Sequence, residues 1–161
     1  PERGYFAQGA GDPATWIFRK LFQHVLVALR VLQAQTEVDE DRIAACGMSQ
    51  GGGMAIWSGA VSPIVKAVCA DMPFLGQVRQ TLSRSGYRYP IKELVDFMES
   101  ETFGREKVLY TTSYFDTVHL ASRCRVPTQV SRGLKDPACR PETAEAIYNA
   151  LDGKKRLVTY D

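Results

Sequence analysis

The nine residues CGMSQGGGM, at positions 46 to 54, decide how this chain folds. Ser49 lies between Gly47 and Gly51, and this GxSxG spacing follows a short apolar run at residues 43–46. A strand that turns at once into a helix brings backbone atoms close together, and glycines two residues before and after the turning residue remove the clash. The side chain at the apex is then held outward. The pattern predicts a nucleophile elbow with Ser49 as the nucleophile.

The surroundings of such a serine favour acyl transfer. Ligands of open parallel sheets bind beyond the carboxyl ends of the strands, where this hydroxyl would project. The backbone amide of Gln50, at the positive end of the following helix, would point at the developing oxyanion. No Gly-Lys-Ser/Thr follows the glycines and no GxGxxG is present, so neither nucleotide-binding loop fits. A tight turn with no catalytic role is the alternative.

Composition bounds the classes of function. The chain has 161 residues, about the length of one domain, with 45% apolar and 24% charged residues. A net charge of +2 without a dense basic patch argues against nucleic acid as a partner. No apolar run is long enough to span a bilayer, and no signal peptide is visible at the start, so we expect no membrane partner.

Cysteine spacing argues against a metal centre. The four cysteines form no CxxC pair and no zinc-like cluster, so we expect no metal site. The acyl transfer predicted for Ser49 needs no organic cofactor. They are interpreted as buried or free thiols in a reducing compartment, which favours a cytoplasmic location. The cysteines are Cys46, Cys69, Cys124 and Cys139.

Strand-like and helix-like segments alternate, which predicts an α/β fold with a mostly parallel sheet and flanking helices. We expect a helix that begins at Asp12-Pro13 and reaches about residue 35, with one apolar face. Residues 1–12 are expected to be a loop, and residues 76–116 contain several short helical patterns. The apolar face comprises Ile17, Leu21, Val25, Leu29 and Leu32. The expected strands are 43–46, 65–71, 128–134 and 156–160, and the other expected helices are 54–61 and 141–151.

A triad on this fold needs an acid after the serine and a histidine after the acid. Asp136 follows the predicted strand 128–134, which suits a carboxylate that orients an imidazole. Asp before Pro is also common in turns, so Asp136 has a structural alternative. Asp71 and Asp116 compete for the role, and position alone does not exclude Asp71.

A set of short motifs, in order along nearly the whole chain, resembles carbohydrate esterase family seven. This is the family of acetyl xylan esterases and cephalosporin C deacetylases. The resemblance is far more specific than GxSxG alone. The matching stretches are VDEDRI at 38–43, GMSQGGG at 47–53, KAV at 66–68, DMPFL at 71–75, SYFD at 113–116, GLKD at 133–136 and AIYN at 146–149.

The resemblance implies a partial α/β-hydrolase fold over residues 1–161, with residues 76–116 as a helical insertion. It implies a serine esterase that removes acetyl groups from acetylated xylo-oligosaccharides, cephalosporin C or other small acetyl esters, possessing no cofactor and able to form homo-oligomers. Ser49 would be the nucleophile, Gln50 an oxyanion donor through its amide, and Asp136 the triad acid. Asp71 and Asp116 would then be structural.

The chain departs from the family pattern in its histidines. His24 and His119 both precede Asp136, so neither is in triad order, and each is interpreted as a surface residue. In the family the catalytic histidine follows the strand that corresponds to 156–160, and first strands and an oxyanion-hole tyrosine precede this region. We therefore expect an internal fragment of an esterase, inactive by itself. A truncated remnant that acts as a binding module and another α/β-hydrolase, such as a dienelactone-type hydrolase, are the alternatives.

Overall fold

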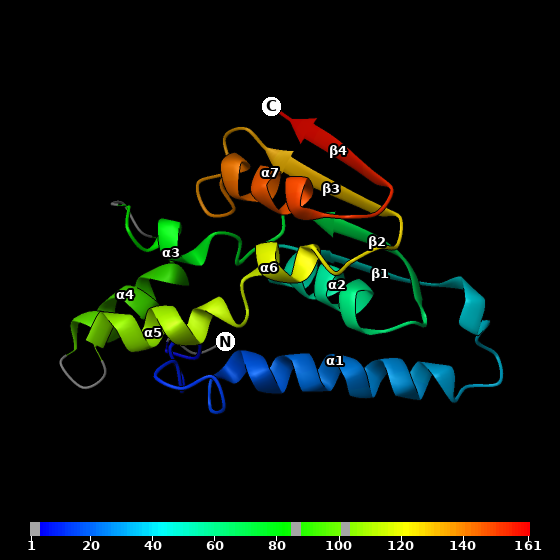
Figure 1. Ribbon diagram of the computed structural model, residues 1–161, viewed down its shortest axis with the longest axis horizontal. Coiled ribbons are helices and arrows are strands. Elements are labelled where there is room, and N and C mark those ends of the chain that lie inside the picture. The colour runs from blue at the N-terminus through cyan, green and yellow to red at the C-terminus, as the bar shows by residue number, and fades with distance from the viewer. Residues whose placement is uncertain (1–3, 85–87, 101–103) are drawn as a thin grey trace.

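A computed structural model describes residues 4–84, 88–100 and 104–161. Its centre is a four-stranded sheet in which every neighbouring pair is parallel and the spatial order follows the chain (Figure 1). The predicted parallel sheet is confirmed, and each predicted strand lies within two residues of an observed one. The strands are β1 (Ile43–Met48), β2 (Val65–Asp71), β3 (Thr128–Gly133) and β4 (Lys155–Tyr160).

Helices cover one face of this sheet (Figure 1). Helix α2 (Gln50–Val61) packs on β1 and β2, and α7 (Pro141–Ala150) packs on β3 and β4. Helix α6 (Thr117–Ala121) lies against both α2 and α7. The apolar side chains between the helices and the sheet form one core, which includes Ile56, Val65, Val68, Val130 and Ile147.

The other face of β1 is open to solvent in the described part of the chain. Its burial alternates along the strand, and Ala44, Cys46 and Met48 are exposed. The short apolar run at residues 43–46 is typical of a strand buried on both faces, but only one face of β1 is buried here. The physical reason is that, among the described residues, α2 covers one face of β1, so only every second side chain enters the core.

The first long helix begins later than predicted. Helix α1 spans Ile17–Gln33, whereas residues 12–16 form turns in which the Asp12 carboxylate accepts from the Ala14 amide at 2.8 Å. Trp16 has an extended backbone, and its indole Nε1 donates to the carbonyl of Phe6 at 2.8 Å. This tertiary hydrogen bond fixes Trp16 outside the helix and delays the start.

The buried face of α1 also differs from the predicted one. Phe18, Phe22 and Leu29 are buried, while Leu32 is 42% exposed. The cause is aromatic packing, because Phe22 stacks on Trp57 of α2 with ring centroids 4.4 Å apart. The remaining members of the predicted face, Ile17, Leu21 and Val25, are half-buried.

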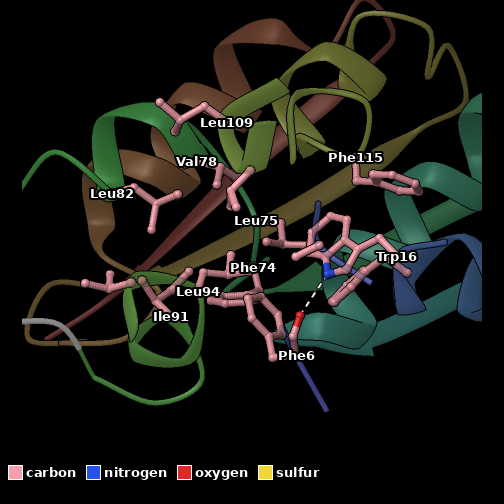
Figure 2. Packing of buried hydrophobic residues seen from close by; sticks show 14 of the residues in the cluster. Phe6, Trp16, Phe74, Leu75, Val78, Leu82, Ile91, Leu94, Leu109 and Phe115 are labelled. Carbon is pink, nitrogen blue, oxygen red and sulfur yellow. Dashed lines mark hydrogen bonds between the residues drawn. The ribbon is translucent and has the colours of Figure 1, made fainter. Parts of the chain in front are cut away.

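A second core joins the N-terminal segment to the helical region between β2 and β3 (Figure 2). Phe6 is fully buried although residues 1–12 were expected to be only a loop, and its amide donates to the carboxylate of Glu93 at 2.9 Å.

Residues 76–116 contain three helices, which agrees with the predicted helical patterns. They are α3 (Val78–Thr81), α4 (Ile91–Glu99) and α5 (Gly104–Ser113). Residues 85–87 and 101–103 lie outside the described residues. That this segment is an insertion within one domain stays a prediction. A short 3-10 helix, Glu40–Arg42, precedes β1.

Candidate active site

Ser49 is the single residue between the end of β1 and the start of α2. Its φ of 53° and ψ of −117° lie outside the regions that L-residues prefer, so the backbone is strained there. The end of β2 holds it in place: the Ser49 amide donates to the Asp71 carbonyl at 2.9 Å, and the Phe74 amide donates to the Ser49 carbonyl at 2.9 Å. The side chain is half-buried. The sharp strand-to-helix reversal predicted from GxSxG is confirmed.

The glycines around Ser49 permit close backbone approach. A Cβ added to Gly47 would lie 2.4 Å from the carbonyl carbon of Gly51, and one added to Gly53 would lie 2.7 Å from the Phe74 carbonyl oxygen. The helix therefore begins at Gln50, and the predicted start at residue 54 is wrong. The prediction failed because glycine is a poor helix former, whereas here it is needed for packing.

Gln50 begins α2, so its N–H is one of the first-turn donors that have no acceptor within the helix. Such a donor next to the serine can receive the negative oxygen of a tetrahedral intermediate. The Gln50 side chain is occupied elsewhere, since its Oε1 accepts from the Tyr5 hydroxyl at 3.1 Å. Burial and the nearby carboxylate of Glu93 raise the pKa of Tyr5, so its hydroxyl remains a donor.

Asp136 lies in the turn after β3, at the same edge of the sheet as Ser49 because all the strands are parallel. Its Oδ1 accepts from the amides of Ala138 at 2.8 Å and Cys139 at 2.9 Å. Within the described chain, these hydrogen bonds use one carboxylate oxygen and leave Oδ2 for another donor. A carboxylate fixed in this way can orient an imidazole.

Cys139 connects the turn that contains Asp136 to Ser49. Its Sγ lies 3.5 Å from the Ser49 hydroxyl oxygen, and its side chain is buried at 3% exposure. Burial raises the pKa of this thiol and the hydrogen bond with Ser49 opposes the rise, so the thiol stays protonated at neutral pH. Sequence reasoning missed Cys139 as a site residue. The available signal was its position three residues after Asp136, in the same turn.

The competing acids have structural partners. Asp71 accepts from the hydroxyl of Ser131, which in turn accepts from the Met72 amide at 3.0 Å, so this carboxylate links β2 to β3. Asp116 is buried and accepts from the amides of Gln77, Val78 and Val118 at 3.1, 2.8 and 3.0 Å. Both arrangements agree with the structural roles that the resemblance implies.

The two histidines make no described hydrogen bond to the candidate catalytic residues. His24 on α1 and His119 on α6 are exposed, as predicted, and no described hydrogen bond joins either one to Ser49 or Asp136. Among the described residues, no cluster of three or more His, Cys, Asp or Glu side chains could hold a metal ion. None of the described helices is long and apolar enough to cross a membrane.

Comparison with known proteins shows that the chain is similar to acetyl xylan esterases. The model of the acetyl xylan esterase (AXE1) family matches residues 1–161. The acetyl esterase Axe7A of Xylanibacter ruminicola is 27% identical over 98% of this chain and 35% of its own length. An acetyl xylan esterase from a Paenibacillus species superposes with a TM-score of 0.90 at 32% identity, over 100% of this chain and 52% of that one.

Two further structures extend the comparison. Acetyl xylan esterase 1 from a Thermoanaerobacterium species has a TM-score of 0.85 at 28% identity, again over 100% of this chain and 52% of its own. An acylaminoacyl peptidase from Pyrococcus horikoshii, at 18% identity, shares the α/β-hydrolase fold alone, with a TM-score of 0.67 over 87% of this chain and 23% of its own. The chain thus spans about half the length of the two solved esterases and about a third of the curated relative.

Proposed function

Because this chain belongs to the acetyl xylan esterase family, we propose that the whole protein is a serine esterase that removes acetyl groups from acetylated xylo-oligosaccharides. The observation that carries the proposal is the strained conformation of Ser49 between β1 and α2, with the turn of Asp136 and Cys139 beside it. Cephalosporin C, which carries its acetyl ester on a different scaffold, is a second proposed substrate of the same site.

The proposed reaction is a two-step acyl transfer with Ser49 as the nucleophile. The Ser49 oxygen attacks the acetyl carbonyl carbon while an imidazole takes the hydroxyl proton. The Gln50 amide stabilises the oxyanion, and the C–O bond to the sugar breaks as the imidazole returns the proton to the departing alcohol. Water then attacks the acetyl-enzyme, which releases acetate and restores Ser49.

Asp136 would orient this imidazole through its free oxygen, Oδ2. We infer that neither His24 nor His119 supplies the imidazole, since both precede Asp136 in the chain, both are exposed, and no described hydrogen bond joins either one to Ser49 or Asp136. We propose that the base comes from outside residues 1–161, after β4, as the family resemblance implies. Triad residues act as a unit, so we expect the 161-residue chain alone to have no useful esterase activity.

We propose that the protein works in a reducing, cytoplasmic environment. All four cysteines are free, and Cys46 is exposed on the open face of β1. An oxidising compartment would favour pairing of exposed thiols, so this usage fits a reducing one.

The decisive experiment compares the full-length protein with its Ser49→Ala variant. We expect the wild type to release acetate from acetylated xylo-oligosaccharides and from p-nitrophenyl acetate, and the variant to lose about 10⁶-fold in kcat. Ser62→Ala, at the other end of α2, is the matched control and should keep the wild-type rate. A fluorophosphonate should add its mass to the wild type and not to Ser49→Ala.

If Ser49→Ala hydrolyses these esters at the wild-type rate, the proposal is wrong. A full-length wild type without activity would instead favour a non-catalytic binding module.

A further inference from the structure

The Cys139 side chain touches the serine on one side and a small apolar hollow on the other. Its sulfur lies 3.5 Å from the Ser49 oxygen. The same residue lines a hollow of about 20 Å³, which has room for about one water molecule. The hollow is otherwise lined largely by apolar side chains from the region after β2, including Phe74, Leu75, Val78 and Ile91.

We propose that Cys139 sets the upper size limit of the acyl group that Ser49 accepts, with its sulfur as the wall between the serine and the hollow. This inference rests on the proposed esterase function and names the residue that limits its acyl group to acetyl. In this proposal, the sulfur leaves room beside Ser49 for an acetyl methyl group and for no longer chain. Without the sulfur, the hollow becomes continuous with that space and can take a longer acyl chain.

The wall is fixed, which is what size selection requires. The Cys139 amide donates to Asp136 at 2.9 Å, and the Pro at position 141 begins α7 two residues later. The serine is fixed as well, because its carbonyl accepts from the Phe74 amide, and Phe74 also lines the hollow. A rigid wall and a rigid nucleophile cannot move apart to admit a longer chain without losing these hydrogen bonds.

The chemistry of the hollow suits a hydrocarbon chain. A neutral buried thiol behaves as a small apolar group, and the raised pKa of Cys139 keeps it neutral. Each buried methylene is favoured by about 0.8 kcal/mol when an apolar space is open to it. Pockets that discriminate by one methylene reach about 10- to 200-fold in kcat/KM.

The test measures acyl-chain selectivity in the full-length protein. The probes are p-nitrophenyl acetate, propionate and butyrate, and the readout is the ratio of kcat/KM for acetate to that for butyrate. Cys139→Ala should lower this ratio by about 10-fold or more, because the hollow opens. Cys139→Ser, which conserves the size of the side chain, should keep the ratio within about 2-fold, and the bulkier Cys139→Val should raise it or leave it unchanged.

A second buried cysteine provides the matched control. Cys124 is fully buried against β3, where its thiol contacts the Thr128 hydroxyl at 3.6 Å. Cys124→Ala should lose stability and keep the wild-type acetate-to-butyrate ratio. A wild type that hydrolyses none of the three esters would contradict the proposed function. An active wild type whose ratio survives in Cys139→Ala would overturn this inference alone.

If circular dichroism shows that Cys139→Ala is unfolded, Cys139→Val and Thr143→Ala decide the matter, and a lower ratio in Cys139→Val would overturn the inference. Thr143 also lines the hollow, and Thr143→Ala enlarges it from the α7 side without touching Ser49. We expect this variant alone to leave the ratio unchanged, because the sulfur still closes the hollow. A drop of about 10-fold or more in the ratio of Thr143→Ala, with Cys139 intact, would overturn the inference.

Discussion

Gly47 and Gly51 approach each other across the serine turn so closely that only one of them could carry a side chain. A Cβ on Gly47 would lie 2.4 Å from both the carbonyl carbon and the carbonyl oxygen of Gly51. A Cβ on Gly51 would meet no atom of the described chain within 4 Å, apart from its neighbours and its own helix backbone. Close backbone packing therefore requires glycine at position 47, whereas it does not require glycine at position 51.

Gly47→Ala should destabilise the full-length protein by about 1–3 kcal/mol, because backbone atoms on both sides must shift to relieve the clash. Gly51→Ala is the matched control. It should change the free energy of unfolding by no more than about 1 kcal/mol, since alanine favours the helix that Gly51 occupies. Urea unfolding measures both variants. Equal destabilisation by the two substitutions would contradict the asymmetry.

The turn could be predicted from sequence because its determinants are local. The strand 65–71 was predicted with the observed bounds of β2, Val65–Asp71, since a short apolar run between turn residues is a local signal as well. The start of α1 was not predictable in this way. It depends on the hydrogen bond from the Trp16 indole to the Phe6 carbonyl, which is formed only when the N-terminal segment folds back.

The candidate site shows the same limit. GxSxG marks Ser49 within nine residues, and Asp136 follows a recognisable strand. The contact between Ser49 and Cys139 joins residues 90 positions apart, and no periodicity in the sequence reports it. Sequence therefore indicated which residues to consider, whereas their juxtaposition depends on the order of strands in the sheet.

Asp116 should prove essential for folding and not for chemistry. Its buried carboxylate accepts three backbone amides, from Gln77, Val78 and Val118, and so ties the start of α3 to the start of α6. Asp116→Ala leaves these donors without their acceptor, and the expected cost is about 3 kcal/mol or more in the free energy of unfolding. Denaturant unfolding measures this cost. The folded fraction should keep the wild-type kcat; a selective loss of kcat without a stability change would point to a catalytic role.

Asp136→Asn should give the opposite result. Asparagine keeps a side-chain oxygen that can accept from the Ala138 and Cys139 amides, so the turn should survive. It cannot supply the charge that stabilises an imidazolium, and kcat for p-nitrophenyl acetate should fall about 10⁴-fold in the full-length protein. Asp152→Asn, at an exposed pair with Arg125, is the control and should leave kcat unchanged. Retention of kcat within about 10-fold in Asp136→Asn would exclude the proposed role.

The buried thiols should make stability fall at alkaline pH. Burial is the largest cause that raises the pKa of Cys124 and of Cys139 in the folded state. The unfolded chain then releases these protons first, at a thiol pKa of about 8.5, so it binds fewer protons than the folded chain above that pH. The stabilising contribution is therefore complete below the unfolded-state pKa. The free energy of unfolding must decrease as pH rises from that value through the raised folded-state pKa.

Urea unfolding between about pH 7 and pH 10 measures the slope. Cys124→Ser removes one titrating thiol while other groups stay the same, so its decline should be shallower than that of the wild type. Parallel curves for the two proteins would show that this thiol titrates alike in the folded and unfolded chains.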